Sequence, residues 1–450
     1  MTHSDKPKIV IWVESLLGKG HLPQMDEYSR ALMEKGYDVH LVSSSFWRAP
    51  ELKYGGAMLH DLGDNKPGDG RHRILFDPDK RIYTTPEGVP IEQARSFFQL
   101  RQKKLEDIID AIKPDAIVTD HYPFARGNLP DIDNVIHKIG RQRESSGVGP
   151  VIIGEARDVI GAFSPPAGGS ASAAENIIAK YYDQIFVMSD PKYCEFQSGL
   201  DPKCYENKME YVGYQGSCDF FPRDHTIRDA DRKIVMAGGN SNTHEWLALV
   251  KNVIQEFHAL PPDNPLKRHE LVVYMSPDYD TDKFEEVQKL AKQTGERITV
   301  RRNAPLKEFR EAVGNAAYLI SHAGVNQSIE VLASGVPSLM ATRELHASNN
   351  EQGIRAKEYA SKGAPMLQLG MDTWENRSVI AEHLQQLSGM QFKGQNTDIR
   401  LGGGPALADA THKLLQERGV IRHEGRMPRL RLDGMSLAGS TSGQFTHPCS

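Results

Sequence analysis

The most specific chemical pattern in the sequence is the run 321–330, which reads SHAGVNQSIE and follows a short apolar stretch, Tyr318–Ile320. The apolar stretch predicts a buried strand, and the run predicts a turn into a helix that Asn326 would cap. Backbone N–H groups at such a helix start, together with the helix dipole, favour binding of a diphosphate. A plain capped core helix would explain Asn326 and the apolar helix face, but not the histidine, glycine and glutamate together.

Glu330 would lie one turn into this helix, where a carboxylate can accept hydrogen bonds from two hydroxyls of a ribose. The run therefore predicts a site for a nucleotide diphosphate. Its expected binding residues are His322, Gly324, Asn326, Gln327, Ser328 and Glu330.

A second glycine-containing turn follows the apolar run Lys233–Ala237. Gly238, Gly239 and Asn240 can form a nest of backbone N–H groups at a helix start, which suits an anion. An ordinary strand-to-helix turn is the alternative.

A cluster of amide and carboxylate side chains includes Glu351 and Gln352. Such groups suit the hydroxyls of a sugar ring, because these both donate and accept hydrogen bonds. Taken alone, the cluster is better explained as a polar helix start.

The first half of the chain opens with a similar turn after the apolar run Ile9–Val13. Gly18 and Gly20 would let a ligand approach the backbone, and His21 follows them at the head of a helix. The turn is neither a dinucleotide fingerprint, because Pro23 takes the third glycine position, nor a Walker loop. His21 is expected to be a general base or a hydrogen-bonding group; a packing or capping histidine is the alternative.

Asp120 and His121 follow the apolar run Ala116–Thr119, and Arg157 follows the run Val151–Gly154. Parallel strands end at the same edge of a sheet, so these side chains are expected near His21. Asp120 or His121 could orient or deprotonate an acceptor. An ion pair that steadies the loops is the alternative.

The elements that must position these residues alternate between apolar runs and helical patterns. The pattern predicts parallel sheets covered on both faces, and it restarts after Gly213, which predicts two Rossmann-like α/β domains. Helices are predicted over 25–35 and 91–112. The predicted domains are 1–212, 213–420 and a basic, disordered tail at 421–450. The predicted strands are Ile9–Val13, Asp38–Val42, Ala116–Thr119, Val151–Gly154, Gln184–Met188, Lys233–Ala237, Leu271–Met275, Ile298–Val300, Tyr318–Ile320 and Pro337–Met340.

Composition narrows the function classes. The 450 residues include 54 Lys and Arg against 59 Asp and Glu, a net charge of −5, which argues against a nucleic-acid partner. No apolar run is long enough to span a bilayer, and a polar start to the chain predicts no signal peptide. Four cysteines without a CxxC pair predict reduced thiols and a cytoplasmic protein. Four arginines at the start of this tail, Arg422, Arg426, Arg429 and Arg431, leave peripheral contact with the inner membrane face as an alternative.

Together these motifs resemble the GT-B glycosyltransferases of family 28. The closest group consists of predicted bacterial transferases related to the enzyme that adds N-acetylglucosamine to the peptidoglycan lipid intermediate. The resemblance runs from Ile9 to about Leu415 and is most specific over 321–337 and 350–356.

The resemblance implies that Glu351 and Gln352 touch the donor sugar and that Gly238, Gly239 and Asn240 form a phosphate loop. It also implies that Gly18, Gly20 and His21 belong to the acceptor loop.

The expected activity is inverting transfer from a nucleotide-diphosphate sugar. No cofactor and no obligatory metal are expected, because helix starts can neutralise the leaving diphosphate. The sugar is expected to come from a UDP sugar, and the acceptor is a small molecule, a glycan or a lipid-linked molecule. A nucleotide-sugar hydrolase or 2-epimerase of the same fold, and a non-catalytic sugar-nucleotide-binding subunit, are the alternatives.

Overall fold

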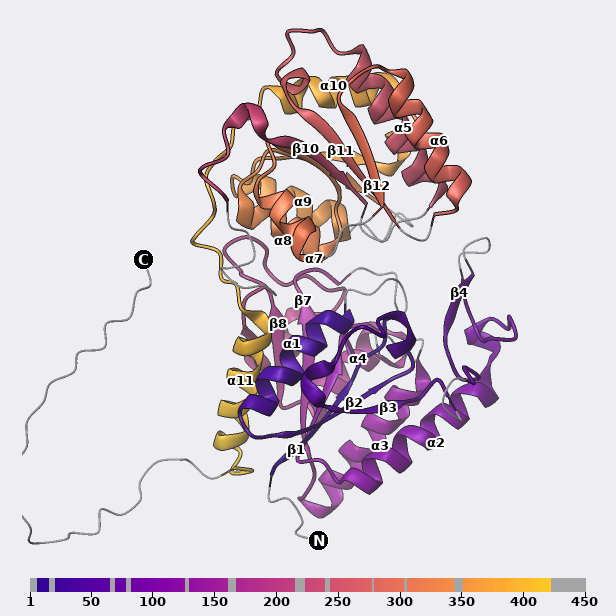
Figure 1. Cartoon of the computed structure of the whole chain (residues 1–450). Helices are drawn as coiled ribbons and strands as arrows, with labels where there is room; N and C mark the ends of the chain where they lie inside the picture. Colours follow the sequence, from indigo (N-terminus) through magenta and orange to yellow (C-terminus); the bar gives the residue numbers. More distant parts are fainter. Residues whose placement is uncertain are drawn as a thin grey trace, which may run out of the picture.

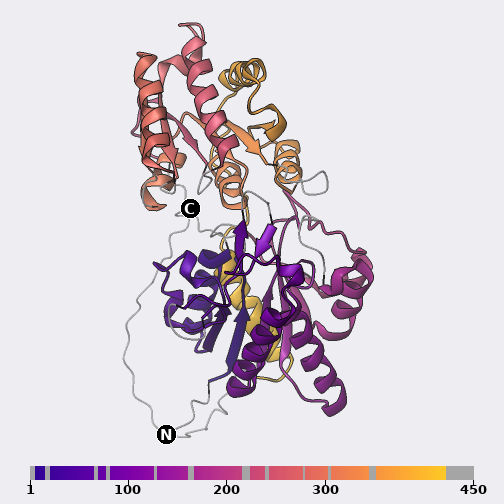
Figure 2. The same ribbon diagram turned by 90° about the vertical axis from the view of Figure 1, so that its right-hand side faces the viewer.

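The computed structural model describes residues 6–15, 21–64, 69–77, 82–125, 129–160, 167–214, 223–238, 243–276, 279–302, 306–343 and 351–421. These residues form two α/β lobes, one above the other in Figure 1 and again in the turned view of Figure 2. The predicted tail lies almost wholly outside the described residues.

The first lobe contains a seven-stranded sheet in which all neighbouring strands are parallel. Its order is β3 (Met58–Asp61), β2 (Asp38–Ser43), β1 (Lys8–Trp12), β6 (Ala116–Asp120), β7 (Val151–Arg157), β8 (Gln184–Met188) and β9 (Met209–Tyr211). A separate hairpin joins β4 (Leu75–Asp77) to β5 (Ile82–Thr84).

Alternate residues of β1 pack on opposite faces of this sheet, as the two-residue period of a strand requires. Ile9 and Ile11 lie in one buried cluster with α1 (His21–Glu34). Val10 and Trp12 lie in the other. The helices on that second face are α2 (Arg95–Ile112), α3 (Pro130–Ser146) and α4 (Ala171–Tyr181).

The second lobe repeats the plan with six parallel strands. Their order is β12 (Ile298–Arg302), β11 (Glu270–Met275), β10 (Lys233–Ala237), β13 (Tyr318–His322), β14 (Ser338–Thr342) and β15 (Met366–Gly370). One face is covered by α5 (His244–Ala259), α6 (Thr281–Gln293) and α10 (Arg377–Ser388). The other is covered by α7 (Leu306–Gly314), α8 (Val325–Ser334) and α9 (Glu351–Ser361).

Each sheet has one point where the strand order reverses. In the first sheet it lies between β1 and β6, and in the second between β10 and β13. Ligands of open parallel sheets bind at such points, beyond the carboxyl ends of the strands. Most of the predicted site residues lie at the ends of these four strands or just after them, whereas Arg157 ends β7 and Glu351 and Gln352 come after β14.

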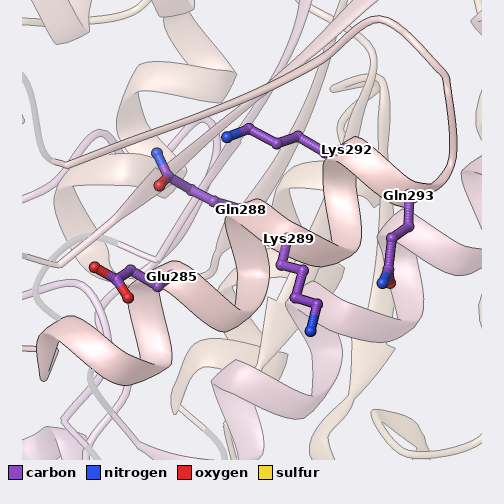
Figure 3. A pocket seen from close by; sticks show the side chains of 5 residues that line it. All are labelled: Glu285, Gln288, Lys289, Lys292 and Gln293. Atoms are coloured by element: carbon purple, nitrogen blue, oxygen red, sulfur yellow. The ribbon is translucent and has the colours of Figure 1, made fainter.

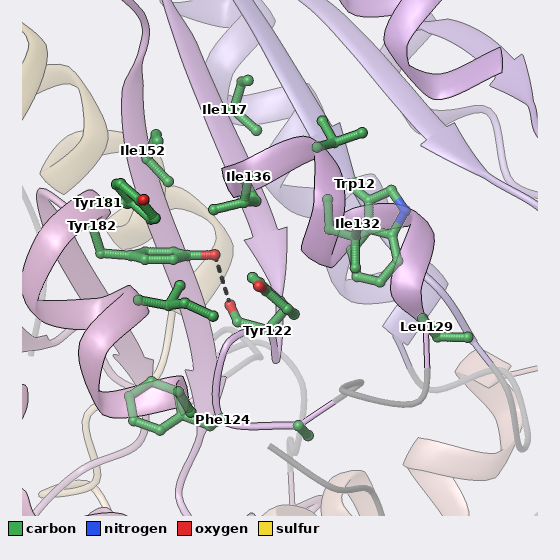
Figure 4. Packing of buried hydrophobic residues seen from close by; sticks show 14 of the residues in the cluster. Trp12, Ile117, Tyr122, Phe124, Leu129, Ile132, Ile136, Ile152, Tyr181 and Tyr182 are labelled. Carbon is green, nitrogen blue, oxygen red and sulfur yellow. Dashed lines mark hydrogen bonds between the residues drawn. The ribbon is translucent and has the colours of Figure 1, made fainter. Parts of the chain in front are cut away.

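The turn that carries His121 is held by an aromatic cluster of the first lobe (Figure 4). The Tyr182 hydroxyl lies 2.8 Å from the Thr119 hydroxyl and donates to the carbonyl of Tyr122 at 3.4 Å. Phe124 packs edge-on against Phe196. The residues after β6 are therefore fixed by packing.

Helix α11 (Gly403–Glu417) packs on the first lobe, beside α1 (Figure 1). Leu407 and Leu415 are buried in the same cluster as the core face of α1, and the hydroxyls of Tyr28 and Thr411 lie 2.7 Å apart. The predicted second domain, 213–420, included this segment. The difference arises because an amphipathic helix does not specify which of two apolar sheet faces it covers.

A buried ion pair joins the lobes. The Arg355 guanidinium of α9 donates to both carboxylate oxygens of Asp158, which follows β7, at 2.8 to 3.0 Å. The Tyr359 hydroxyl also donates to Asp158, at 3.1 Å. All three side chains are buried.

Among the described residues, Cys194 and Cys204 are free thiols. No helix in the described part of the chain has both the length and the apolarity that crossing a bilayer requires.

Candidate functional site

The switch point of the first sheet carries two histidines and one carboxylate. Asp120 is the last residue of β6, His121 follows it, and His21 is the first residue of α1. One oxygen of Asp120, Oδ1, lies 2.9 Å from His21 Nδ1 and 2.7 Å from His121 Nδ1. The two imidazole rings meet edge to face with centroids 4.6 Å apart. The structure thus brings together the predicted catalytic residues.

Burial and neighbouring charges give the two histidines opposite properties. Burial and the Arg157 charge hold the pKa of His21 well below its usual value, although Asp120 opposes them. Burial alone would lower the pKa of His121 as well, but Asp120 and Glu155 raise it above the usual value. Both histidines hold the pKa of the buried Asp120 well below its usual range. At neutral pH, His21 is therefore the ring that can accept a proton.

Behind the histidines lies a buried carboxylate that the sequence analysis did not single out. Glu155 lies inside β7, accepts a hydrogen bond from Gln24 Nε2 at 2.7 Å, and has Oε2 3.7 Å from His121 Nδ1. Arg157, two residues on, donates to Gln24 Oε1 at 3.3 Å. An acidic residue within an otherwise apolar strand is the sequence signal that could have found Glu155.

His21, Asp120 and His121 are also the described residues whose ligand atoms could hold a metal, since these atoms lie within 4.8 Å of one another. Their hydrogen bonds account for the arrangement without an ion. The nearby Arg157 charge interacts with Asp120 and opposes a further cation. We therefore interpret the group as a hydrogen-bonded acid–base cluster.

The switch point of the second sheet carries the run that begins at Ser321. His322 ends β13, and α8 begins at Val325 with Gly324 as its N-cap. Asn326 is thus the second residue of the helix, and the prediction that it caps α8 is wrong. Gly324 adopts the extended cap conformation by itself, so no side-chain cap is needed and the first N–H groups of α8 have no side-chain cap bond.

Two buried polar atoms at this helix start have no hydrogen-bond partner among the described residues: His322 Nε2 and Ser328 Oγ. The His322 ring lies edge-on to Trp246 and Trp374, and burial with the Arg343 charge lowers its pKa to about 3. His322 is therefore neutral and can donate a single N–H. Buried polar groups are normally satisfied, so these two atoms are available for a further hydrogen bond at the start of α8.

Glu330 is buried in α8 with Oε1 3.6 Å from Arg310 Nε of α7. Burial raises the pKa of Glu330 to about 7, and Arg310 opposes the shift. Arg310 also interacts with the charge of Glu27, which belongs to α1 of the first lobe. Glu330 thus lies on the side of its lobe that faces the other.

Gly238 follows β10, but its lack of a side chain has a packing cause. A Cβ atom there would overlap the Trp246 indole. Gly239 and Asn240, predicted to bind phosphate with it, lie outside the described residues, as do Gly18 and Gly20 of the predicted acceptor loop.

The predicted donor-sugar residues open α9. Gln352 Oε1 accepts a hydrogen bond from the backbone N–H of Arg343 at 2.9 Å. Glu351 is close enough to Arg157 of the first lobe for their charges to interact. Arg157 therefore links the surroundings of the two histidines to the start of α9. Gln327 Nε2 donates to the Ala237 carbonyl at 3.3 Å, which joins α8 to the end of β10.

Two surface hollows lie elsewhere in the second lobe. The hollow in Figure 3, of about 580 Å³, is lined by side chains of α6 alone, so it cannot enclose a ligand. A hollow of about 110 Å³ is lined by Val235, Val272 and Tyr274 among others, away from the strand ends that carry the predicted residues.

No protein-family model and no curated protein matches this sequence. Solved structures do match over nearly the whole chain. MurG from Acinetobacter baumannii is 14% identical with a TM-score of 0.54, and the match covers 90% of this chain and 100% of that one. The glycotransferase of kitacinnamycin is 14% identical with a TM-score of 0.53, covering 91% and 99%.

The chain has the GT-B fold. A UDP-GlcNAc 2-epimerase from Neisseria meningitidis, solved with UDP-GlcNAc bound, shares the architecture at 10% identity and a TM-score of 0.51, with 91% of this chain and 100% of that one covered. The GT-B assignment confirms the predicted fold class of two Rossmann-like domains. At these identities the likeness concerns the fold.

Proposed function

We propose that the chain is an inverting, metal-independent glycosyltransferase that moves a sugar from a UDP sugar to an acceptor hydroxyl. The observation that carries this proposal is the pair of switch points. One presents a neutral histidine paired with a carboxylate. The other presents a helix start whose buried donors have no hydrogen-bond partner within the described part of the chain.

The second lobe would hold the donor. His322 Nε2, Ser328 Oγ and the first N–H groups of α8 suit diphosphate oxygens, and the dipole of α8 favours the same negative charge. Glu330 would accept the ribose hydroxyls. Glu351 and Gln352 would contact the sugar, and Gly239, Asn240, Asn326 and Gln327 would complete the donor side.

The first lobe would hold the acceptor. His21 Nε2 takes the acceptor hydroxyl proton, while Asp120 accepts the Nδ1–H hydrogen bond and stabilises the imidazolium that forms. The acceptor oxygen attacks the anomeric carbon from the face opposite the diphosphate. The bond to the diphosphate oxygen breaks, its electron pair leaves with that oxygen, and the configuration inverts.

Helix α8 stabilises the charge that grows on the leaving diphosphate, so the proposal includes no cofactor and no metal. The acceptor is a small molecule, a glycan or a lipid-linked molecule. For a lipid-linked acceptor, the enzyme would work at the inner membrane face.

A second candidate activity is epimerisation or hydrolysis of a nucleotide sugar. It is favoured by the fold likeness to two UDP-GlcNAc 2-epimerases, one of them described as putative. Such enzymes need no acceptor hydroxyl.

The test is a panel of nucleotide sugars, first by thermal shift and then by turnover. A binding donor should raise the melting temperature by mass action. Turnover of that donor should then require an acceptor from a panel of lipid and soluble hydroxyl compounds. Rapid acceptor-free release of UDP, or a new sugar epimer, would replace the proposal with the second candidate.

A further inference from the structure

Two histidines share one oxygen of Asp120, although a single base needs only one partner. His121 approaches Oδ1 at 2.7 Å, closer than the 2.9 Å of His21. Because both Nδ1 atoms face this oxygen, each ring turns its Nε2 away from Asp120. Deprotonation of the acceptor needs only one base, so the imidazole of His121 must have a different role.

The backbone conformation of His121 is unusual. Its φ of +61° lies in the left-handed region, which is unfavourable for a residue with a Cβ atom. The conformation is held by two backbone hydrogen bonds of 2.8 Å, from His121 N–H to the Glu155 carbonyl and from Ala125 N–H to the His121 carbonyl. Strained residues persist where the surroundings enforce them, typically at functional sites.

Glu155 gives His121 a second carboxylate. Its Oε2 is buried, lies 3.7 Å from His121 Nδ1, and has no hydrogen-bond partner among the described residues. A buried carboxylate is costly unless a cation accompanies it. His121 lies between Asp120 and Glu155 and, as an imidazolium, balances them.

We propose that His121, backed by Glu155, is a positioning residue that fixes the Asp120 carboxylate and limits how strongly it holds a proton on His21. The inference rests on the proposed function for the role of His21. In this assignment His121 carries the positive charge of the cluster. His21 remains the residue that takes the proton from the acceptor hydroxyl.

The charges that face the cluster agree with this assignment. Asp120 comes from β6, Glu155 and Arg157 from β7, and His21 from α1; Arg157 in turn interacts with Glu351 and Arg355 of α9. The His121 charge lowers the pKa of His21, whereas Glu155 helps to raise that of His121. Without the His121 charge, Asp120 would hold a proton on His21 more strongly.

The test is a pH titration of the ligand-free protein, labelled with ¹⁵N in histidine and observed by NMR. Variants H21Q and H121N identify the two signals. Asn is chosen at 121 because it tolerates a left-handed backbone and keeps a neutral N–H donor. Variant E155Q removes the charge of Glu155 with little change of shape, and H137N on α3 is the control.

We expect His121 to be an imidazolium at pH 7 in the wild type. H121N should raise the pKa of His21, E155Q should lower that of His121, and H137N should move neither. A merely structural histidine would not shift the titration of its neighbour. A neutral His121 at pH 7 would overturn the inference, and so would an unchanged His21 titration in a folded H121N variant. If H121N does not fold, an unchanged His121 titration in E155Q would overturn it.

This titration does not require the protein to turn over a substrate. A result that contradicts the role of His121 can therefore be told apart from a result that contradicts the proposed function. Where an acceptor is found, the acid limb of the kcat/KM profile should move to higher pH in H121N. An acid limb that stays in place would contradict the inference even if transfer itself is observed.

Discussion

Glu330 provides a prediction that can be worked through from the structure. Its pKa of about 7 follows from burial in α8, and the ribose contact requires the ionised carboxylate as acceptor. Donor affinity should therefore fall as the pH drops through 7. With that pKa, about nine-tenths of the carboxyls are ionised at pH 8 and about one-tenth at pH 6. The dissociation constant should rise about ten-fold, which is about 1.4 kcal/mol.

Isothermal titration calorimetry with UDP-N-acetylglucosamine at pH 8 and pH 6 measures this difference. A nucleotide sugar is a better probe than UDP, because its phosphates do not titrate over this range. The His322 pKa of about 3 also keeps that side chain out of the window. E330Q should bind about 1.5 to 3 kcal/mol more weakly at pH 8, because a charge-assisted contact is lost, and should show no pH dependence.

The control variant is E308Q, on the neighbouring helix α7, where the carboxylate is half-exposed and 3.7 Å from Arg301. It should keep both the affinity and the pH dependence of the wild type. Equal wild-type affinity at the two pH values, or wild-type affinity in E330Q, would refute the ribose contact.

Three further predictions follow from the same structure. H21Q should lower the transfer rate by about 10²- to 10⁴-fold with donor affinity unchanged, measured by product formation and calorimetry; a larger effect on binding would argue against a base. D158N leaves the buried Arg355 guanidinium without its counter-charge, so the free energy of unfolding in urea should fall by about 3 to 5 kcal/mol. The double variant D158N/R355M should recover part of this loss. No recovery would mean that the loss is not due to the ion pair. G238A should lower the free energy of unfolding by about 1 to 3 kcal/mol, because the added Cβ overlaps the Trp246 indole. Adding W246F to G238A should restore part of that stability. A fully stable G238A with weaker donor binding would favour a phosphate role for Gly238 instead.

The strands were predictable because buried parallel strands are continuous apolar runs. All ten predicted strands occur, several of them one to three residues longer at one end, as in β7, which continues through Glu155 to Arg157. The missed strands β3, β4, β5 and β15 are short or partly exposed, so their apolar signal is diluted. The helix predicted from Met25 begins at His21, since Pro23 is tolerated in a first turn.

The positions of the candidate site residues were predictable one by one, but the contacts among them were not. Spacing alone placed His21 and Asp120 at one sheet edge, because parallel strands end together. The sharing of Asp120 by two rings depends on the left-handed backbone at His121, which sequence does not reveal. The pairing of Glu330 with Arg310, like that of Asp158 with Arg355, joins segments far apart in the chain, and such partners emerge only from tertiary packing.

The return of α11 to the first lobe means that the chain passes between the halves twice. The two passages are bonded to each other: Tyr214 N–H donates to the Arg400 carbonyl at 2.8 Å, and Gly403 N–H donates to the Tyr214 carbonyl at 2.8 Å. Such a doubled connection resists separation of the halves more than a single passage would. Together with the Asp158–Arg355 ion pair, it ties the half that carries His21 to the half that carries Glu330 at more than one point.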